Sequence, residues 1–268
     1  MENVKARGLV LLGCGKMGSA MLKGWLAGGL PPSSVTVLDP HPSDWLQSTG
    51  VHLNTDLPKD PAIVLVAVKP QMMGDALPKL QALGNGTTLF LSVAAGITLA
   101  TYETVLGADT PVVRAMPNTP AAVGRGITAI IGNAKAGAED LDLAETLLSA
   151  VGQVVRLEDE AQMDAVTAVS GSGPAYVFHL IETLAAAGVE QGLSPELAMQ
   201  LAKATVGGSG QLAEESDEDP AQLRVNVTSP GGTTAAALAV LMDEKTGFPA
   251  LLSKAVKAAA DRSKELAG

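Results

Sequence analysis

The chain has 268 residues, of which 47 % are hydrophobic but only 3 % aromatic, and its formal net charge is −10. This length allows one large or two ordinary domains, with a core built mainly from Ala, Val and Leu. The negative charge argues against a nucleic-acid partner or an anionic membrane surface, and no apolar run reaches the roughly 20 residues that span a bilayer. Because Cys14 is the single cysteine, no intrachain disulfide is possible, and we expect a cytoplasmic protein.

The first predicted strand and helix flank a glycine-rich turn. The apolar run Leu9–Leu12 is typical of a parallel strand buried on both faces, and helix-forming residues extend over 19–27. Between them, Gly13, Gly15 and Gly18 give the pattern G-x-G-x-x-G. The first glycine allows a tight turn, the second lets the backbone approach a pyrophosphate, and the third lets the helix pack closely on the strand. The pattern predicts a dinucleotide-binding turn, with a purely structural turn as the alternative.

The next elements bear on which nucleotide this turn would hold. Free N–H groups at the helix start, where Lys16 and Met17 stand, would bind the pyrophosphate together with the positive end of the helix dipole. Val35–Leu38 is predicted as the second strand and is followed by Asp39, near the place where dinucleotide folds put an acid that accepts from the ribose 2′-hydroxyl. Residues 40–57 contain no Lys or Arg to offset a 2′-phosphate. Alternatively, this aspartate only opens a turn with the proline that follows it.

Strands continue to alternate with helices up to about residue 158. Further strands are predicted at Ile63–Val68, Leu89–Val93, Val112–Ala115, Thr128–Ile131 and Val154–Leu157. Helical spacing is found in Leu77–Leu83, Leu99–Leu106 and Glu139–Val151. The alternation predicts a doubly wound parallel sheet, in which ligands bind beyond the carboxyl ends of the strands. Lys69, Ala95 and Asn118 each follow a strand end, so we expect them to line one edge of the cofactor crevice.

The second half of the chain is predicted to be entirely helical. Its helices are expected at Pro174–Gln191, Pro195–Glu215, Thr234–Asp243 and Pro249–Leu266. The acidic run 214–219 lacks the spacing of a calcium loop, so it is interpreted as a solvated helix end and no metal site is predicted. Two small-residue turns, 170–174 and 229–234, put hydroxyls and free N–H groups at helix starts. They indicate a receptor for a small carboxylate or phosphate, with ordinary helix capping as the alternative.

Five motifs stand in order along the chain. They are GCGKMG at 13–18, AVKP at 67–70, RAMPNTP at 114–120, AVSGSGPAY at 168–176 and SPGGTT at 229–234. Together they resemble those of the pyrroline-5-carboxylate reductases, which make proline by reducing a cyclic imine. The resemblance implies an α/β N-terminal Rossmann domain, residues 1–158, and an all-helical C-terminal domain, residues 159–268, that binds substrate and forms dimers. It also implies a homodimer with interleaved helices, which assembles into decamers in some family members.

The resemblance also assigns roles to individual residues. The cofactor, NADPH or NADH, would be bordered by Ala67, Val68, Lys69, Pro70, Ala94, Ala95 and, from the helical domain, Asn226. The carboxylate of 1-pyrroline-5-carboxylate would be held by backbone N–H groups of the turn that begins at Ser229, chiefly those of Gly232 and Thr233. Thr234 would hydrogen-bond the ring nitrogen as the catalytic residue, and Glu160 matches an acidic family position near the same pocket.

Two residues depart from the family pattern. Val225 replaces an acid that some members carry beside Asn226, so the contacts around this position are expected to differ from those of such members. Asp39 stands where NADPH-preferring members often have Ser or Thr, so the local sequence favours NADH whereas the family favours NADPH.

The chemistry needs no catalytic histidine, because a protonated C=N bond already carries positive charge and the enzyme mainly positions hydride donor and acceptor. His41 and His52, in predicted loops, and His179, on a helix, are interpreted as structural. One alternative is a β-hydroxyacid dehydrogenase, which would need a Lys proton donor, but no Lys occurs in 157–202. The other is a dinucleotide-sensing protein without turnover, which would have no need of a carboxylate site.

Overall fold

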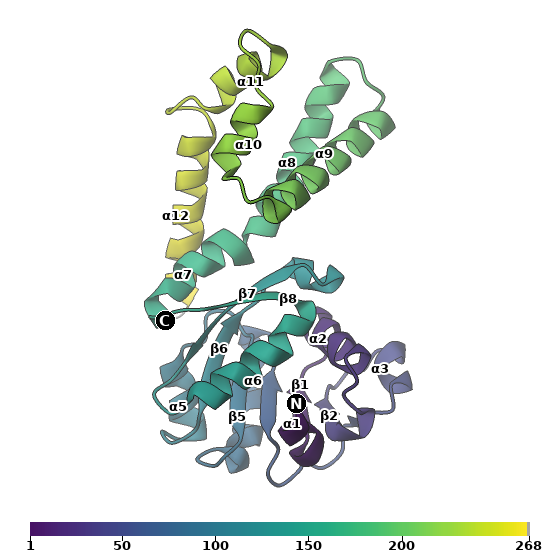
Figure 1. The fold of residues 1–268 in the computed structure, drawn as a ribbon. Coiled ribbons are helices and arrows are strands. Elements are labelled where there is room, and N and C mark those ends of the chain that lie inside the picture. The colour runs from purple at the N-terminus through teal and green to yellow at the C-terminus, as the bar shows by residue number, and fades with distance from the viewer. Residues whose placement is uncertain (267–268) are drawn as a thin grey trace. The chain divides into compact units, whose positions relative to one another are not determined.

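The computed structural model describes residues 1–266, and its contacts divide the chain into two compact units. The first comprises Met1–Gly171 together with the C-terminal residues from Ala260, and the second comprises Ser172–Ala259. The unit that contains the first residues of the chain therefore also contains the last described ones, up to Leu266; Figure 1 shows the course of the chain. The domain boundary expected between residues 158 and 159 remains a prediction.

The first unit is built on an eight-stranded sheet with the order β3-β2-β1-β4-β5-β6-β7-β8. Its strands are β1 (Leu9–Leu12), β2 (Val35–Leu38), β3 (His52–Leu53), β4 (Ile63–Val66), β5 (Leu89–Ser92), β6 (Val112–Met116), β7 (Gly126–Gly132) and β8 (Gly152–Arg156). Strands β1 to β6 pair in parallel, which confirms the predicted fold class. The strand order reverses between β1 and β4, the kind of place at which doubly wound sheets bind ligands.

Two features of the sheet differ from the prediction. β7 pairs with β6 in antiparallel orientation, and β8 runs parallel to β7. The connecting segment 117–125 is too short for the crossover that a parallel pair requires, so the chain turns back beside β6. In addition, His52 was expected in a loop but begins the short strand β3 at the sheet edge.

Helices cover both faces of this sheet. They are α1 (Glu2–Arg7), α2 (Lys16–Ala27), α3 (Asp44–Ser48), α4 (Met73–Ala76), α5 (Leu99–Leu106), α6 (Ala138–Leu148) and α7 (Met163–Val166). Short 3₁₀ segments occur at Pro32–Ser34, Pro70–Met72, Leu77–Leu83, Thr119–Val123, Ser149–Val151 and Glu160–Gln162. The helix predicted at Leu77–Leu83 is thus a 3₁₀ helix that continues α4.

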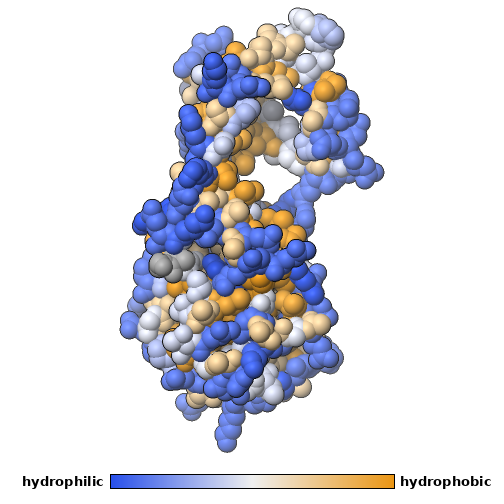
Figure 2. Space-filling view, turned by 90° about the vertical axis from the view of Figure 1, so that its left-hand side faces the viewer, coloured by the Kyte–Doolittle hydropathy of each residue, from blue (hydrophilic) through white to orange (hydrophobic). Residues whose placement is uncertain are grey.

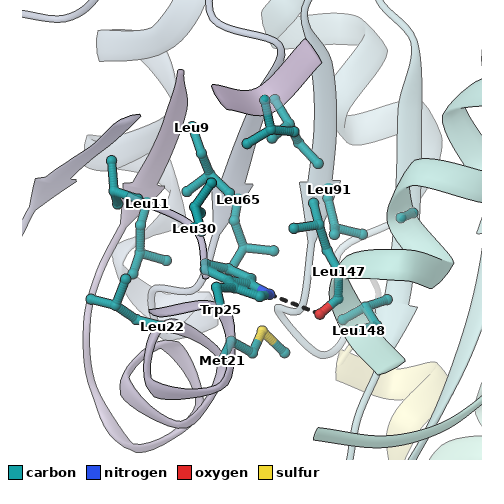
Figure 3. Packing of buried hydrophobic residues seen from close by; sticks show 14 of the residues in the cluster. Leu9, Leu11, Met21, Leu22, Trp25, Leu30, Leu65, Leu91, Leu147 and Leu148 are labelled. Atoms are coloured by element: carbon teal, nitrogen blue, oxygen red, sulfur yellow. Dashed lines mark hydrogen bonds between the residues drawn. The ribbon is translucent and has the colours of Figure 1, made fainter. Parts of the chain in front are cut away.

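Alternate residues of each central strand enter two separate hydrophobic cores. Leu9 and Leu11 face a core that includes α2 and α6, whereas Val10 and Leu12 face the core that includes α4 and α5. In the first core, the Trp25 indole donates a 2.8 Å hydrogen bond to the carbonyl of Leu147 (Figure 3). This bond satisfies the single polar group of a side chain that is otherwise packed among leucines. Helices are therefore fixed on both faces, which leaves the strand ends as the place for a ligand.

The second unit consists of helices, as the sequence predicts. They are α8 (Gly173–Glu190), α9 (Pro195–Glu215), α10 (Pro220–Asn226), α11 (Thr233–Leu241) and α12 (Phe248–Leu266), whose last turns belong to the first unit. The bounds of α9 match the prediction because Ser194 caps its first turn and Pro195 opens it. The sequence did not reveal α10. Among the described residues no helix is both long and apolar enough to cross a membrane.

Candidate active site

The glycine turn between β1 and α2 has the conformation that its sequence predicts. Gly13 adopts φ 87°, and an added Cβ would lie 3.0 Å from the Ala67 carbonyl oxygen. A Cβ at Gly18 would lie 2.5 Å from the Gly13 carbonyl oxygen, so only glycine lets α2 start this close to β1. Gly15 differs from both, because its φ is −69° and an added Cβ would meet no atom of the described residues within 4 Å.

Gly15 therefore shows that the turn fits a dinucleotide. Neither packing nor backbone conformation of the protein requires glycine there, whereas close approach of a phosphate to the backbone does. Gly15 caps α2, whose first three residues are Lys16, Met17 and Gly18. The N–H groups of these positions have no carbonyl acceptor within the helix and are available to an anion. Within residues 1–266, no atom packs into the space beside Gly15.

The carboxyl ends of four adjacent parallel strands carry the predicted cofactor residues. The glycine turn follows β1, the AVKP motif 67–70 follows β4, Ala94 and Ala95 follow β5, and Asn118 follows β6. The sheet order brings these segments together along one edge of the sheet. The Asn118 amide oxygen accepts a 3.0 Å hydrogen bond from the Ile127 N–H, which fixes this side chain against β7.

A buried hydroxyl pair holds the loop after β5. The Ser92 side chain is hydrogen-bonded to the Tyr102 hydroxyl, and its oxygen also accepts from the Ala94 N–H at 3.2 Å. Tyr102 is fully buried in α5, and this burial raises the pKa of its hydroxyl to about 12. The pair therefore stays neutral at physiological pH and anchors the segment that is predicted to border the cofactor.

Asp39 lies at the glycine turn, half-buried, with both carboxylate oxygens engaged. Oδ2 accepts from the Cys14 N–H at 2.7 Å, and Oδ1 accepts from the His41 N–H at 2.8 Å. The second contact is the turn that the sequence offered as the alternative for Asp39, while the first joins the end of β2 to the glycine motif. Burial, with a further contribution from Asp39, raises the pKa of the Cys14 thiol to about 11, so the thiol is protonated at neutral pH.

Glu160 forms an ion pair inside the first unit. Its Oε1 accepts from the guanidinium of Arg114 at 2.6 Å and from the Leu99 N–H, at the start of α5, at 2.9 Å. The Arg114 side chain is only 6 % exposed, whereas that of Glu160 is 30 % exposed. The pair ties β6, α5 and the 3₁₀ segment 160–162 to one another. No spacing in the sequence indicates this pair, and the contact of Glu160 with substrate remains a prediction.

The segment 170–174 is not a turn, contrary to expectation. Thr167–Gly171 forms a π-helix that continues α7, and Ser172 has helical backbone angles before α8 begins. The Ser170 hydroxyl donates to the Val166 carbonyl at 3.0 Å, so it caps no helix start. An added Cβ at Gly171 would lie 2.5 Å from the terminal methyl group of Met116, which a small movement of that flexible side chain would relieve. The segment thus continues a helix through a π-helical turn, a conformation often found at functional sites.

The segment 229–234 does form the predicted turn at a helix start. Gly231 adopts φ 71°, and the Gly232 N–H donates to the Ser229 carbonyl at 3.0 Å. Gly232 caps α11, and Thr233 and Thr234 are its first two residues. Their N–H groups lack acceptors within the helix, whereas that of Gly232 is already used in the turn.

Asn226, at the end of α10, is held by two other polar side chains. Its Nδ2 donates to Glu218 at 2.9 Å, and its Oδ1 accepts from Gln222 at 2.8 Å. Glu218 belongs to the acidic run that was interpreted as solvent-facing, and its link to Asn226 was missed. The two residues lie on either side of the start of α10, so no helical periodicity connects them.

Known protein families match segments in each of the two units. A family model described as pyrroline-5-carboxylate reductase dimerisation matches residues 160–266, and one described as NADP oxidoreductase, coenzyme F420-dependent, matches residues 8–96. The pyrroline-5-carboxylate reductase of Pseudomonas aeruginosa is 41 % identical over 97 % of this chain and 96 % of its own length. That of Synechocystis is 43 % identical, over 96 % of this chain and 97 % of its own.

Solved structures give the same result. The pyrroline-5-carboxylate reductase of Coxiella burnetii superposes with a TM-score of 0.91 at 35 % identity, covering 98 % of this chain and 99 % of its own. The Plasmodium falciparum pyrroline carboxylate reductase with NADP bound gives 0.84 at 30 % identity, with the same coverage. The dinucleotide turn, the helix start at 229–234 and full-length similarity to these enzymes show that the chain belongs to the pyrroline-5-carboxylate reductase family.

Proposed function

We propose that this chain reduces 1-pyrroline-5-carboxylate to L-proline with a reduced nicotinamide dinucleotide, the last step of proline synthesis. The observation that carries the proposal is the presence in one chain of a glycine turn with open space at Gly15 and a helix start at 233–234 with free N–H groups. The first suits a pyrophosphate and the second suits a carboxylate. Relatives that carry the name of this enzyme are about 40 % identical over nearly the whole chain, which supports the same assignment.

Each group of residues has a defined task in this reaction. The N–H groups at the start of α2 hold the pyrophosphate, and the segments after β4, β5 and β6 border the rest of the cofactor, with Asn226 as a further predicted contact. The N–H groups at the start of α11 hold the substrate carboxylate. The Thr234 hydroxyl accepts a hydrogen bond from the protonated ring nitrogen. This bond orients the C=N bond and stabilises the positively charged, protonated form of the imine. When bound, the reduced nicotinamide supplies the hydride, so the residues mainly contribute orientation.

We further propose that NADH is used at least as well as NADPH. The carboxylate of Asp39 accepts a hydrogen bond from a free ribose hydroxyl but repels a 2′-phosphate, at a cost on the order of 4 kcal/mol per charge pair at about 4 Å and an effective dielectric near 20. Rotating this carboxylate away would break its hydrogen bonds to Cys14 and His41, so the charge is held in place. The description of the family model and the name of the Plasmodium structure both mention NADP, so comparing the two cofactors in this protein separates the effect of Asp39 from the preference that those names indicate. The test is the ratio of kcat/KM for the two cofactors in wild type and Asp39→Ser. A strong NADPH preference in the wild type, or an unchanged ratio in the variant, would contradict it.

We infer that the basic unit is a homodimer formed through the helical unit. The decamer that the family resemblance implies for some members stays a prediction. Among the residues that the structure describes, the buried core of that unit consists of Ala185, Ala198 and Ala202, whereas apolar side chains stand exposed on its helices. On α8 they are Val177, Phe178, Leu180, Leu184 and Val189, each at least 37 % exposed. Figure 2, which looks from the side on which α12 lies in Figure 1, shows orange hydrophobic atoms between blue hydrophilic ones on the surface of the helical unit. A surface of this kind marks an interaction site, and the family model that matches it is named for dimerisation.

We propose that the enzyme is cytoplasmic. A single cysteine allows no intrachain disulfide, which is consistent with a reducing compartment.

The proposed activity is tested by direct turnover. The purified protein is mixed with 1-pyrroline-5-carboxylate and either cofactor, and both the loss of reduced-nicotinamide absorbance and the formation of proline are followed. We expect stoichiometric proline. Binding of nucleotide without turnover would indicate a sensor, and oxidation of a β-hydroxyacid in the absence of imine reduction would indicate a dehydrogenase.

A further inference from the structure

Asp39 makes a contact that is unrelated to any ribose. Its Oδ2 accepts a 2.7 Å hydrogen bond from the N–H of Cys14, the residue between the first two glycines of the turn. The adjacent Gly13 N–H donates to the Leu38 carbonyl at 2.8 Å. Two successive N–H groups of the turn are thus bonded to the end of β2, and the carboxylate carries a charge that strengthens its bond.

Asp39 is itself held by Asn54, the residue that follows the neighbouring strand β3. The side-chain amide of Asn54 pairs with the Asp39 backbone in both directions, accepting from its N–H at 2.9 Å and donating to its carbonyl at 2.8 Å. The Asn54 N–H donates to the Val37 carbonyl at 2.8 Å, and its φ of 52° is tolerated because asparagine adopts left-handed conformations. The last pair between β2 and β3 is Val37 with Leu53, and the side chain of Asn54 continues the contact to Asp39. A rigid position results for the carboxylate.

The N–H groups of the turn therefore divide into two sets. Those of Gly13 and Cys14 are occupied by β2, whereas those at the start of α2, from Lys16 to Gly18, point to no acceptor within the helix. If the Cys14 bond were lost, β2 would hold the turn only through the Gly13 N–H. An anion site made of backbone N–H groups depends on their preorganised direction, so its affinity depends on this bond.

We propose that Asp39 is a positioning residue that fastens the glycine turn in the free protein and thereby sets the affinity for the dinucleotide pyrophosphate. This rests on the proposed function, since the pyrophosphate belongs to the proposed cofactor. It differs from the ribose contact, because it acts through the Cys14 N–H and serves NADH and NADPH alike.

The test compares Asp39→Ala with Asp39→Asn and with the control Asp56→Asn, which removes an exposed acid close by in the sequence. In the nucleotide-free protein, hydrogen exchange is followed by mass spectrometry in peptides covering residues 12–18. We expect exchange at least about tenfold faster in Asp39→Ala, as for loss of a hydrogen bond to a charged group. Asp39→Asn keeps one acceptor oxygen and is expected to restore part of the protection, and the control is expected to match the wild type. Peptides within β4 should be unchanged in every variant, which establishes that the fold is intact.

The second readout is the affinity for NADH and for NADPH, measured by nucleotide fluorescence. Asp39→Ala and Asp39→Asn remove the same charge beside the ribose, but only Asp39→Asn keeps an acceptor oxygen for the Cys14 N–H. We therefore expect both nucleotides to bind more weakly in Asp39→Ala than in Asp39→Asn. Equal affinities of the two variants for both nucleotides would mean that Asp39 acts only at the ribose, and that result would overturn the proposal. Unchanged exchange at residues 12–18 would also overturn it. If the wild type binds neither nucleotide, the proposed function fails, while hydrogen exchange still decides whether Asp39 fastens the turn.

Discussion

Replacing Gly15 by alanine separates the demands of the fold from those of the ligand. The added methyl group meets no described atom within 4 Å and the φ of −69° suits any residue, so the folded protein accepts it. The lower entropy of the unfolded alanine chain favours the variant by about 0.4–1 kcal/mol, and the weaker helix-capping preference of alanine opposes this by a similar amount. We therefore expect the free energy of unfolding to change by less than about 1 kcal/mol. The affinity for NADH and NADPH should nevertheless fall at least about tenfold, or about 1.4 kcal/mol.

Gly18→Ala provides the opposite case in the same motif. Its methyl group would lie 2.5 Å from the Gly13 carbonyl oxygen, 0.9 Å inside the 3.4 Å at which ordinary contact begins. Such overpacking typically costs about 1–3 kcal/mol, of which helix propensity returns up to about 1 kcal/mol. We expect lower stability together with weaker nucleotide binding, because the turn itself must move.

The two variants are compared by urea unfolding and by nucleotide fluorescence. Gly86→Ala serves as the control, since Gly86 precedes β5 at the opposite edge of the sheet and an added Cβ would have only ordinary contacts of 3.8 Å or more. It should leave nucleotide affinity unchanged. Wild-type affinity in Gly15→Ala would refute the reasoning, because a phosphate that tolerates the methyl group does not approach this backbone.

Four further predictions concern other residues. Thr234→Ala should lower kcat/KM about ten- to 150-fold, the loss of one hydrogen bond to a charged group, while Thr234→Ser keeps most activity; wild-type kinetics in the alanine variant would remove Thr234 from the mechanism. Glu160→Gln leaves the buried guanidinium of Arg114 without a carboxylate, so the free energy of unfolding in urea should fall. Breaking a buried ion pair typically costs about 3–5 kcal/mol, and because the Glu160 side chain is 30 % exposed we expect a decrease near or below the low end of that range. The pKa of the Cys14 thiol is raised from the usual 9.0 to about 11 in the folded protein, so the thiol contributes stability that is fully present below pH 9 and is lost as the pH rises to about 11. At pH 8 the smaller thiolate fraction should make alkylation of Cys14 about 100-fold slower in the folded protein than in the urea-unfolded chain. Equal alkylation rates would contradict this. Light scattering at micromolar concentration should give at least twice the mass of one chain, and a monomer mass would contradict the role inferred for α8.

Local signals in the sequence account for most of the fold. The bounds of β1, β2 and α9 were predicted as observed, because continuous apolar runs mark buried strands and Ser194 with Pro195 marks a helix start. The reversal at β7 was missed because strand patterns carry no direction. The helical course of 170–174 was missed because Ser and Gly are typical of turns, whereas here 167–171 forms a π-helix that continues α7.

The candidate site was predicted less completely than the fold. The glycine turn, with the structural tasks of Gly13 and Gly18, follows from a short motif, and the structure confirms those tasks. Contacts between residues far apart in the chain gave no signal, as with Arg114 and Glu160, 46 positions apart. The bond from Cys14 to Asp39 depends on the conformation of the turn, which spacing alone does not reveal.

The distribution of tryptophan gives the protein a built-in optical probe. Its only two tryptophans, Trp25 and Trp45, both belong to the first unit, the former buried in α2 and the latter with the Lys23 ammonium 4.8 Å from its ring. Tryptophan fluorescence, excited at a wavelength at which tyrosine does not absorb, therefore reports on that unit alone, whereas far-ultraviolet circular dichroism is dominated by helices of both units. Coincident transitions of the two signals in urea would mean that the two units unfold as one cooperative block, and separated transitions would give the helical unit a stability of its own.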